Sequence, residues 1–202
     1  MDRKAVLMRM AVEFVRGECK RLLDGKFPMD KFVLSKTLRS SYKNPDSIAH
    51  KQLADRANDR GTDAYLSNDR IPYVFVVHKE AAAKGQKTLQ GDKIETPEQV
   101  VLAKLKVDYK HYLLQQIQNP IAQVFALAIE YLDGYNKTKH PQIWEKVYRD
   151  QMEKGNGEEI ARRKMEEKRA VVAAGLLFDS LVNEYENRLN GRRMMTDFFK
   201  KK

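Results

Sequence analysis

The chain has 202 residues, of which 42% are hydrophobic and 33% are charged, and these fractions are ordinary for a folded protein with a substantial core. The 38 Lys and Arg residues outnumber the 28 Asp and Glu residues, which gives a formal net charge of +10. This excess favours a polyanionic partner such as nucleic acid or an acidic membrane; the alternative is a basic surface that only solubilises the protein. The single cysteine, Cys19, excludes an internal disulfide and any metal site built from several cysteines, and it fits a reducing compartment.

No apolar run approaches the roughly 20 residues that a membrane span requires. The first ten residues, MDRKAVLMRM, lack the uninterrupted apolar core of a signal peptide. We therefore expect a soluble, intracellular protein.

The first predicted element is a basic, amphipathic helix over residues 3–24, which ends at Gly25. Its apolar positions recur with a helical period and are Val6, Met10, Phe14 or Val15, and Leu22. The apolar run KFVLS then predicts a strand over residues 31–35.

A second helix is predicted to start near residue 47, after a turn at Asn44 and Pro45 and with Asp46 or Ser47 as its cap. The next run, RIPYVFVVHK, is rich in β-branched and aromatic residues and predicts a strand. Pro72 near its start indicates an edge or entry position.

The run KGQKTLQGDKI predicts a polar loop or hairpin, and Thr96, Pro97 and Gln99 then mark a helix start with a capping box. Residues 97–133 are predicted to be mostly helical with a break near Asn119 and Pro120, and residues 121–132 to form the most buried helix. After a flexible break at KGNGEE, residues 158–189 predict one long helix. The predicted fold class is mainly α with a small β component (α+β).

Common catalytic motifs are missing from the sequence. His50, His78, His111 and His140 are scattered without the spacing of a zinc site, and no Walker, Rossmann or nucleophile-elbow motif occurs. The candidate acidic residues are expected to be solvated or to cap helices and turns: Asp63, Asp69, Asp92 and Asp108. We therefore assign no catalytic and no metal-binding residue and expect no enzymatic activity from the chain alone.

Between residues 31 and 132 the chain contains, in order, FVLSKTLRSSYKNPDSIAHKQLADR, NDRIPYVFVV, GDKIETPEQV and VDYKHYLLQQIQNPIAQVF. This order resembles the C-terminal end of the palm and the thumb of a family B DNA polymerase, of the kind found in delta enzymes and large DNA viruses. The matching positions are Lys36 and Leu38; Tyr42, Pro45, Ala49, His50, Leu53, Ala54 and Arg56; Asp69 to Val74; and Asp108, Tyr112, Gln115, Gln116, Pro120 and Phe125.

Several parts of that family's pattern are absent. The DxxSLYPS-type and YGDTDS-type segments with the metal-binding aspartates, the fingers and the exonuclease are missing, as is the cysteine-rich tail of the cellular delta enzyme. The usual Gly-Pro-bearing loop is replaced by ANDRGTDAYLS. The resemblance therefore implies either a fragment of a longer gene product or one subunit of a split polymerase, with no cofactor in this chain and Mg²⁺ expected in the missing palm.

The resemblance implies that the chain grips the primer–template duplex through its sugar-phosphate backbone during DNA replication. Phosphate contacts need cations and polar side chains but no base recognition. The alternative for each cation is a solvated position, and Tyr42 can instead cover the core. We expect these residues to bind DNA: Lys36, Arg39, Tyr42, Lys43, His50, Arg56, Arg60 and Arg70.

The terminal run RRMMTDFFKKK resembles a sliding-clamp-binding box through Met195, Phe198 and Phe199. Arg192 stands where the box usually has glutamine. Two exposed phenylalanines at a terminus are costly unless something buries them, and the alternative is that they fold back onto the C-terminal helix.

The predicted domains are a C-terminal palm-like helix (1–30), a thumb-like duplex-binding domain (31–135), a helical extension (136–190) and a flexible basic tail (191–202). The predicted partners are primer–template DNA, the rest of the polymerase and a sliding clamp, in the nucleus or at a viral replication site, with no membrane contact. Two other functions stay open: a stand-alone nucleic-acid-binding or clamp-adaptor protein, and a helical scaffold that binds acidic proteins. If the chain binds duplex DNA in preference to an acidic polypeptide, the scaffold function is excluded.

Overall fold

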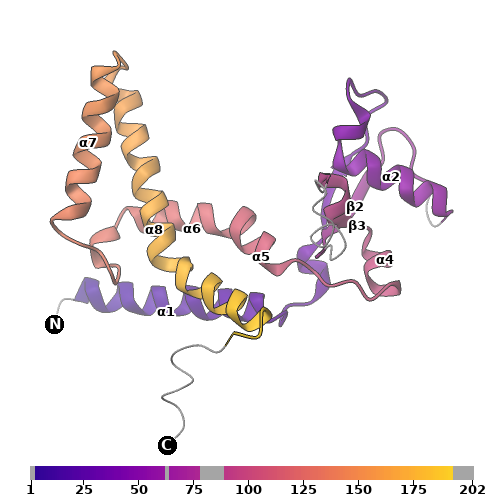
Figure 1. The fold of residues 1–202 in the computed structure, drawn as a ribbon, viewed down its shortest axis with the longest axis horizontal. Coiled ribbons are helices and arrows are strands. Elements are labelled where there is room, and N and C mark those ends of the chain that lie inside the picture. Colours follow the sequence, from indigo (N-terminus) through magenta and orange to yellow (C-terminus); the bar gives the residue numbers. More distant parts are fainter. Residues whose placement is uncertain (1–2, 62–63, 78–88, 193–202) are drawn as a thin grey trace, which may run out of the picture. The chain divides into compact units, whose positions relative to one another are not determined.

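The computed structural model describes residues 3–61, 64–77 and 89–192. These residues form mainly helices and one three-stranded antiparallel sheet, so the predicted fold class is confirmed (Figure 1). The chain folds into two compact units. Unit 1 combines Met1–Asp24 with Leu113–Lys202, and unit 2 is Gly25–Tyr112. Among the described residues, no helix combines the length and the apolar character that a membrane span needs.

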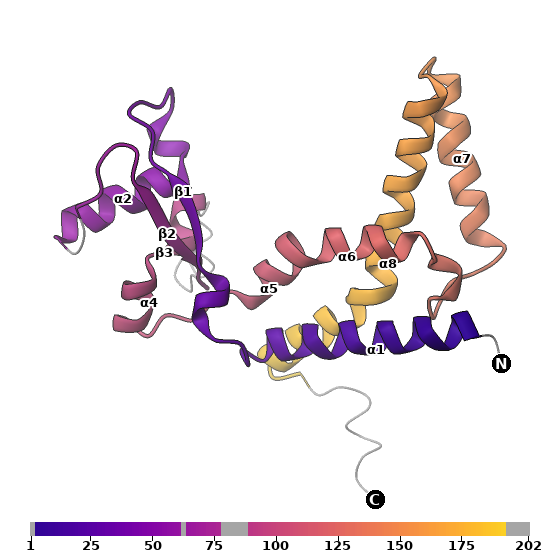
Figure 2. The ribbon, with the colours of Figure 1, turned by 180° about the vertical axis from the view of Figure 1, so that it is seen from behind.

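Unit 1 is helical, and its first and last segments come from opposite ends of the sequence. Its two longest helices are α1 and α8, and α7 and α8 form a hairpin that turns at residues 154–157 (Figure 2). The elements of unit 1 are α1 (Arg3–Leu23), the π-helical segment η4 (Leu113–Ile117), α6 (Gln118–Ala126), the 3-10 helix η5 (Ile129–Tyr131), α7 (Lys139–Glu153) and α8 (Glu158–Leu189).

The core of unit 1 lies along α8, which packs against both α6 and α7. Ala173, Leu177 and Leu181 are buried and recur every four residues, so they lie on one face of the helix. Phe178 beside them is fully buried. The prediction of one long helix over residues 158–189 is confirmed.

A polar ladder joins α8 to α1. Arg16 donates to Ser180, Lys20 pairs with Glu184 at 3.3 Å, and Asp24 pairs with Arg188 at 2.7 Å. Both members of each pair advance by four residues, one helical turn, so the two helices run parallel along this contact.

The predicted extent of α1 is confirmed, but part of its predicted core face is not. Met10 and Phe14 are exposed, whereas Cys19, Leu22 and Leu23 are buried. Gly25 ends the helix with φ +66°, and a Cβ there would lie 2.8 Å from Tyr109 Oη, so glycine is required by both conformation and space.

The prediction that residues 121–132 form the most buried helix is wrong. Helix α6 ends at Ala126, and Val124 and Leu127 are exposed because only one face of α6 packs on α8. The predicted break at Asn119 and Pro120 is also wrong, since the π-helical segment η4 leads directly into α6 and the chain stays helical through both residues.

Unit 2 contains the sheet, with strand order β1-β2-β3 and antiparallel pairing throughout. The helical break within residues 97–133 falls at residues 103–108, where Val107 pairs with Val76. The elements of unit 2 are the 3-10 helix η1 (Met29–Phe32), β1 (Leu34–Thr37), the 3-10 helix η2 (Pro45–Ser47), α2 (Ala49–Arg60), β2 (Arg70–Phe75), the 3-10 helix η3 (Gln90–Lys93), β3 (Ile94–Glu95), α4 (Pro97–Leu102) and α5 (Tyr109–Tyr112).

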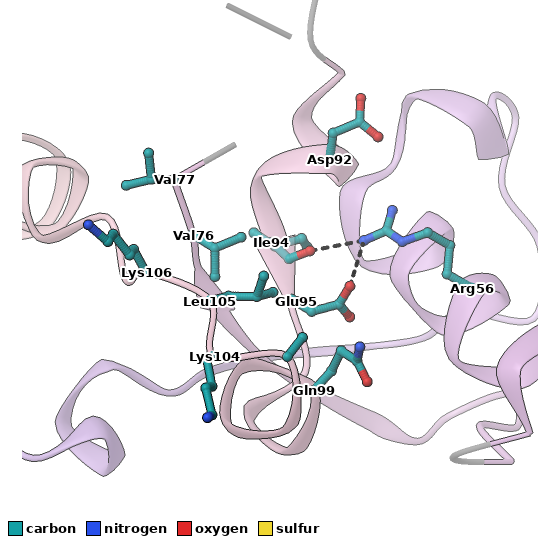
Figure 3. Close-up of a pocket in the computed structure, with 11 residues that line it drawn as sticks. Arg56, Val76, Val77, Asp92, Ile94, Glu95, Gln99, Lys104, Leu105 and Lys106 are labelled. Atoms are coloured by element: carbon teal, nitrogen blue, oxygen red, sulfur yellow. Dashed lines mark hydrogen bonds and ion pairs between the residues drawn. The ribbon is translucent and has the colours of Figure 1, made fainter. Parts of the chain in front are cut away.

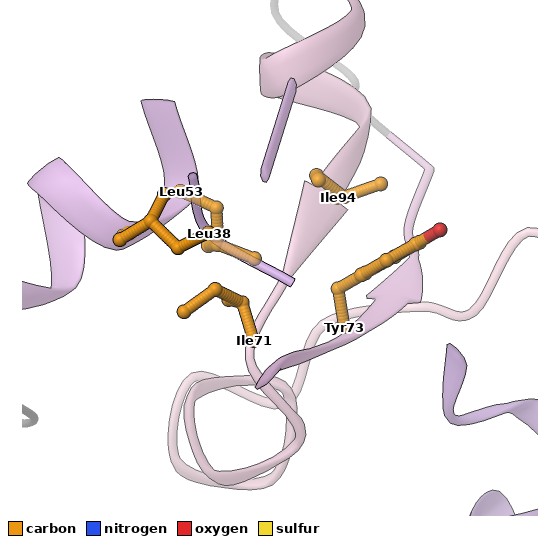
Figure 4. Close-up of a cluster of buried hydrophobic side chains, with 6 residues drawn as sticks. Leu38, Leu53, Ile71, Tyr73 and Ile94 are labelled. Atoms are coloured by element: carbon orange, nitrogen blue, oxygen red, sulfur yellow. The ribbon is translucent and has the colours of Figure 1, made fainter. Parts of the chain in front are cut away.

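Helix α2 packs on one face of the sheet. Ile71 and Tyr73 are two positions apart in β2, so their side chains point to that same face. There they pack with Leu53 of α2 and Ile94 of β3 (Figure 4). Leu38, just after β1, completes this buried cluster.

Two boundary predictions in unit 2 need correction, and a third is confirmed. The first strand begins at Leu34, because buried Phe32 lies in η1. Helix α2 begins at Ala49 without a side-chain cap, since Asp46 and Ser47 form η2. The predicted cap at Thr96 is confirmed, because its hydroxyl accepts a hydrogen bond from the Gln99 N–H at 3.3 Å.

Pro72 lies near the start of β2, as predicted for an entry position, although β2 is the central strand. It faces Ser35 of β1, whereas β3 pairs only with Val74 and Phe75. The sheet therefore lacks a third strand beside Pro72, and the missing N–H removes no bond to β3.

Candidate nucleic-acid interface

The loop that follows β1 is fastened at both of its ends. The Leu38 N–H donates to the Asp69 carbonyl at 2.8 Å, and the Leu38 carbonyl accepts from the Asn68 N–H at 2.7 Å. At the far end, the Gln52 side chain of α2 donates to the Asp46 carbonyl. The stretch between these anchors carries Arg39 and Lys43, which are both exposed.

A tyrosine and a histidine organise this loop from the inside. The Tyr42 hydroxyl lies 2.9 Å from His50 Nε2 and accepts a hydrogen bond from the Arg39 N–H at 2.7 Å. A hydroxyl can donate one hydrogen bond and accept two, so the imidazole tautomer sets the direction of the bond between Tyr42 and His50. Tyr42 also packs against the buried cluster beneath α2, so its predicted role in covering the core is present.

His50 lies in a cationic environment. Burial and the charges of Lys36 and Arg39 lower the pKa of His50 below its ordinary value, whereas a hydrogen bond with the Thr37 backbone acts in the opposite direction. His50 is therefore neutral at pH 7.

Five of the predicted DNA-binding residues thus belong to one place, the end of β1 and the start of α2. Within the described parts of the chain, no carboxylate forms an ion pair with Lys36, Arg39 or Lys43. Their charge remains available to an anion from outside the chain. We call this group the loop cluster: Lys36, Arg39, Tyr42, Lys43 and His50.

Arg56 and Arg60 have internal partners. Arg60 binds Glu95 with two hydrogen bonds of 2.8 and 3.1 Å, and Arg56 lies 3.9 Å from the same carboxylate. Arg56 also donates to the Ile94 carbonyl at 2.9 Å (Figure 3) and to the Gly91 carbonyl at 3.0 Å. These contacts tie α2 to η3 and β3.

Glu95 at the centre of this group is only 8% exposed. Burial alone would raise the pKa of Glu95, but hydrogen bonds from Arg60 and the Thr96 N–H, together with the charges of Arg60 and Arg56, hold that pKa below its ordinary value. Glu95 is therefore a buried carboxylate that needs both arginines. The sequence offered no signal for it beyond an acid placed before a helix cap.

Arg70 turns to the other face of the sheet. It lies opposite Thr37, one position out of phase with Lys36 and Ile71, and it donates to the Ser35 hydroxyl at 2.7 and 3.1 Å. The structure therefore separates Arg70 from the loop cluster, although both lie at the same end of the sheet.

A groove of about 560 Å³ adjoins the Arg56–Glu95 pair. Lys104 and Lys106 lie on the opposite side of the groove, with their side chains directed away from that pair (Figure 3). Sequence reasoning did not single out these two lysines.

The candidate acidic residues act within turns. The carboxylates of Asp69, Asp92 and Asp108 accept from the N–H groups of Leu66, Leu89 and His111 at 2.8, 3.0 and 2.9 Å. The predicted capping role is confirmed for these three, and Asp63 lies outside the described residues. In the described ranges, no set of three or more His, Cys, Asp or Glu side chains is arranged to hold a metal ion.

Comparison with known proteins identifies the family. The sequence model of DNA polymerase family B matches residues 2–128, which is more than half of the chain. The chain belongs to DNA polymerase family B. The match includes all of unit 2 and the whole of α1 and α6 in unit 1, whereas α7 and α8 lie beyond it.

Relatives of this family B chain occur in large DNA viruses and in eukaryotes. It is 35% identical over 191 residues to the DNA polymerase of Pyramimonas orientalis virus, which covers 94% of this chain and 15% of that protein. It is 46% identical over 125 residues to the DNA polymerase of Acanthamoeba polyphaga mimivirus, covering 61% of this chain and 7% of that protein. It is 34% identical over 117 residues to the DNA polymerase delta catalytic subunit of Caenorhabditis elegans, covering 57% of this chain and 10% of that protein.

The family B chain therefore spans about one seventh or less of the length of these relatives. Met195, Phe198 and Phe199, the clamp-box residues, lie outside the described residues.

Proposed function

We propose that unit 2 binds primer–template duplex as the thumb of a family B DNA polymerase during replication. The loop cluster carries this proposal, because three cations without a carboxylate partner in the described chain surround one Tyr–His pair on a fastened loop. The resemblance of residues 31–132 to a polymerase thumb and the net charge of +10 support it.

In this proposal, Lys36, Arg39 and Lys43 contact phosphates on one side of the duplex. Such contacts read the backbone and not the bases, as a protein that follows newly made DNA requires. Arg70 adds a fourth cation from the other sheet face. The DNA contacts predicted for Arg56 and Arg60 stay predictions, and their bonds to Glu95 give them a second task, which is to hold α2 in place.

His50 gives the interface a dependence on pH. A phosphate beside the loop cluster stabilises the imidazolium form, so DNA affinity should rise as the pH falls toward the lowered pKa of His50 in the free chain. Protonation makes both ring nitrogens of His50 hydrogen-bond donors, so the imidazolium can donate to the Tyr42 hydroxyl or to a phosphate.

The rest of the function belongs to other parts of a polymerase. Metal-dependent nucleotidyl transfer would use Mg²⁺ held by palm aspartates that this chain does not contain, and the palm, fingers and exonuclease would be its partners at a nuclear or viral replication site. The terminal Met195, Phe198 and Phe199 would bind a sliding clamp, and tethering by the clamp would raise the local concentration of DNA.

The test is a titration of the chain onto labelled primer–template duplex at several salt concentrations. About four neutralised phosphates give a slope of log affinity against log salt of about −3.6, and Lys36→Gln/Arg39→Gln should flatten that slope by about 1.8. Lys137→Gln/Lys139→Gln, which removes the same charge from unit 1, is the matched control and should change it little. No binding at low salt, or equal effects of the two double variants, contradicts the proposal.

A further inference from the structure

Helix α1 carries an apolar stripe on its surface. Leu7, Met10 and Phe14 are 57%, 61% and 69% exposed. Their spacing of three and four residues places them on one side of the helix. A different part of α1, at Cys19, Leu22 and Leu23, supplies its buried residues.

An exposed stripe of this kind is unfavourable for an isolated protein. A phenylalanine alone can bury 150–250 Å² of surface, roughly, and here it adjoins two further large apolar side chains. Single exposed apolar residues are normal, but contiguous ones mark an interaction site. Val124, Leu127 and Val171 of unit 1 are similarly exposed, but Val124 lies in α6, Leu127 directly follows that helix and Val171 lies in α8.

The charges around the stripe indicate the chemistry of its partner. Glu13 is the only acidic residue between Arg3 and Gly17, and the first turn of α1 contains none. Arg3 stands at the helix N-terminus, where the helix dipole favours negative charge. A surface that carries acidic side chains around an apolar centre would complement both features.

The comparisons indicate which protein can supply that surface. Helix α1 lies within the residues that match the family B model, and the aligned segment makes up only 15% of the Pyramimonas orientalis virus polymerase. Most of such a polymerase therefore lies outside the part that this chain represents.

We propose that the stripe of Leu7, Met10 and Phe14 docks onto the remainder of a family B DNA polymerase, against an apolar surface bordered by acidic residues. This inference rests on the proposed role as part of a polymerase. The stripe lies in unit 1 and the loop cluster in unit 2. Docking of the stripe can therefore be absent while unit 2 binds duplex, and unit 2 can fail to bind duplex while the stripe docks.

The experiment compares the isolated chain with a chimera in which it replaces the 191 aligned residues of the Pyramimonas orientalis virus polymerase. Amide hydrogen exchange over residues 5–17 should slow at least about tenfold in the chimera. Leu7→Gln/Met10→Gln/Phe14→Gln should abolish this protection and lower the melting temperature of the chimera by about 4 °C, while it leaves that of the isolated chain unchanged. Glutamine is chosen because it is a good helix former.

The matched control, Val124→Gln/Leu127→Gln/Val171→Gln, replaces three equally exposed apolar residues elsewhere in unit 1 and should not affect exchange in α1. Mixing the isolated chain with the separately produced remainder of the viral polymerase repeats the exchange measurement without a chimera. Absence of protection in both arrangements overturns the proposal. An equal loss of stability in the isolated chain assigns the stripe to its own fold, and a stable dimer that the triple variant dissociates assigns it to a second copy; either result overturns the proposal.

Discussion

The two units differ in where their ion pairs lie. In unit 1, ion pairs such as Arg162–Glu158 and Lys20–Glu184 lie at the surface, and the buried residues along α8 are apolar. In unit 2, the carboxylate of Glu95 is buried and two arginines of α2 satisfy it. The comparison teaches that an arginine-rich helix face is not by itself a DNA-binding face, because internal carboxylates compete for the same guanidinium groups.

The largest expected effects test whether the two units are stable independently. Phe178→Ala in unit 1 and Leu53→Ala in unit 2 each remove a fully buried side chain and should cost about 3–5 and about 2–5 kcal/mol of unfolding free energy. Hydrogen exchange should accelerate mainly in the unit that carries the substitution. If each substitution accelerates hydrogen exchange equally in both units, the two units unfold together and are not independently stable.

Next in size is the loss of the buried carboxylate. Glu95→Gln should cost unit 2 about 2–4 kcal/mol, because two partly buried arginines lose their counter-charge. Glu184→Gln, which removes a surface partner in unit 1, should cost less than about 1 kcal/mol. Chemical denaturation measures the unfolding free energy of both variants. Equal losses in the two variants would show that the burial of Glu95 does not add to the stability of unit 2.

The same carboxylate predicts a pH dependence. Since the folded pKa of Glu95 lies below the ordinary 4.5, its contribution is fully present above that pH and is lost as the pH falls through the lowered value. The wild-type chain should therefore lose stability in unit 2 at acid pH more steeply than Glu95→Gln, as followed by urea unfolding from pH 6 to pH 3.

A smaller effect is expected from His50. Burial and the nearby cations depress its pKa, so its contribution to stability is present above pH 6.5 and is lost as the pH falls below that value. His111 shifts in the same direction, mainly because of burial, so His50→Gln should remove only part of the dependence. Unfolding curves between pH 7.5 and 5 measure it, and an unchanged dependence in His50→Gln would contradict the assignment.

The smallest effect is expected from the ladder between α1 and α8. A double-mutant cycle on Asp24 and Arg188 should give a coupling energy of about 0.2–1 kcal/mol that decreases with added salt, because Arg188 is largely exposed. A coupling well above this range would make the ladder, rather than the apolar face of α8, the main link between the two helices.

Local sequence patterns determined several helix ends, although they misplaced the start of α2 and the end of α6. The extent of α8, the cap at Thr96 and the end of α1 at Gly25 depend on residues within about one turn of each position, so periodicity and capping rules suffice for them. The order of motifs from residue 31 to 132 likewise predicted the family to which the chain belongs.

Tertiary structure alone decided which side chains are buried and which charges are paired. Arg60 meets Glu95 across 35 positions of sequence, and α1 meets α8 across 164, so no local pattern records either contact. The exposure of Met10 and Phe14 follows from the same cause, because periodicity locates an apolar face on a helix but only the packing of distant segments determines whether anything covers it.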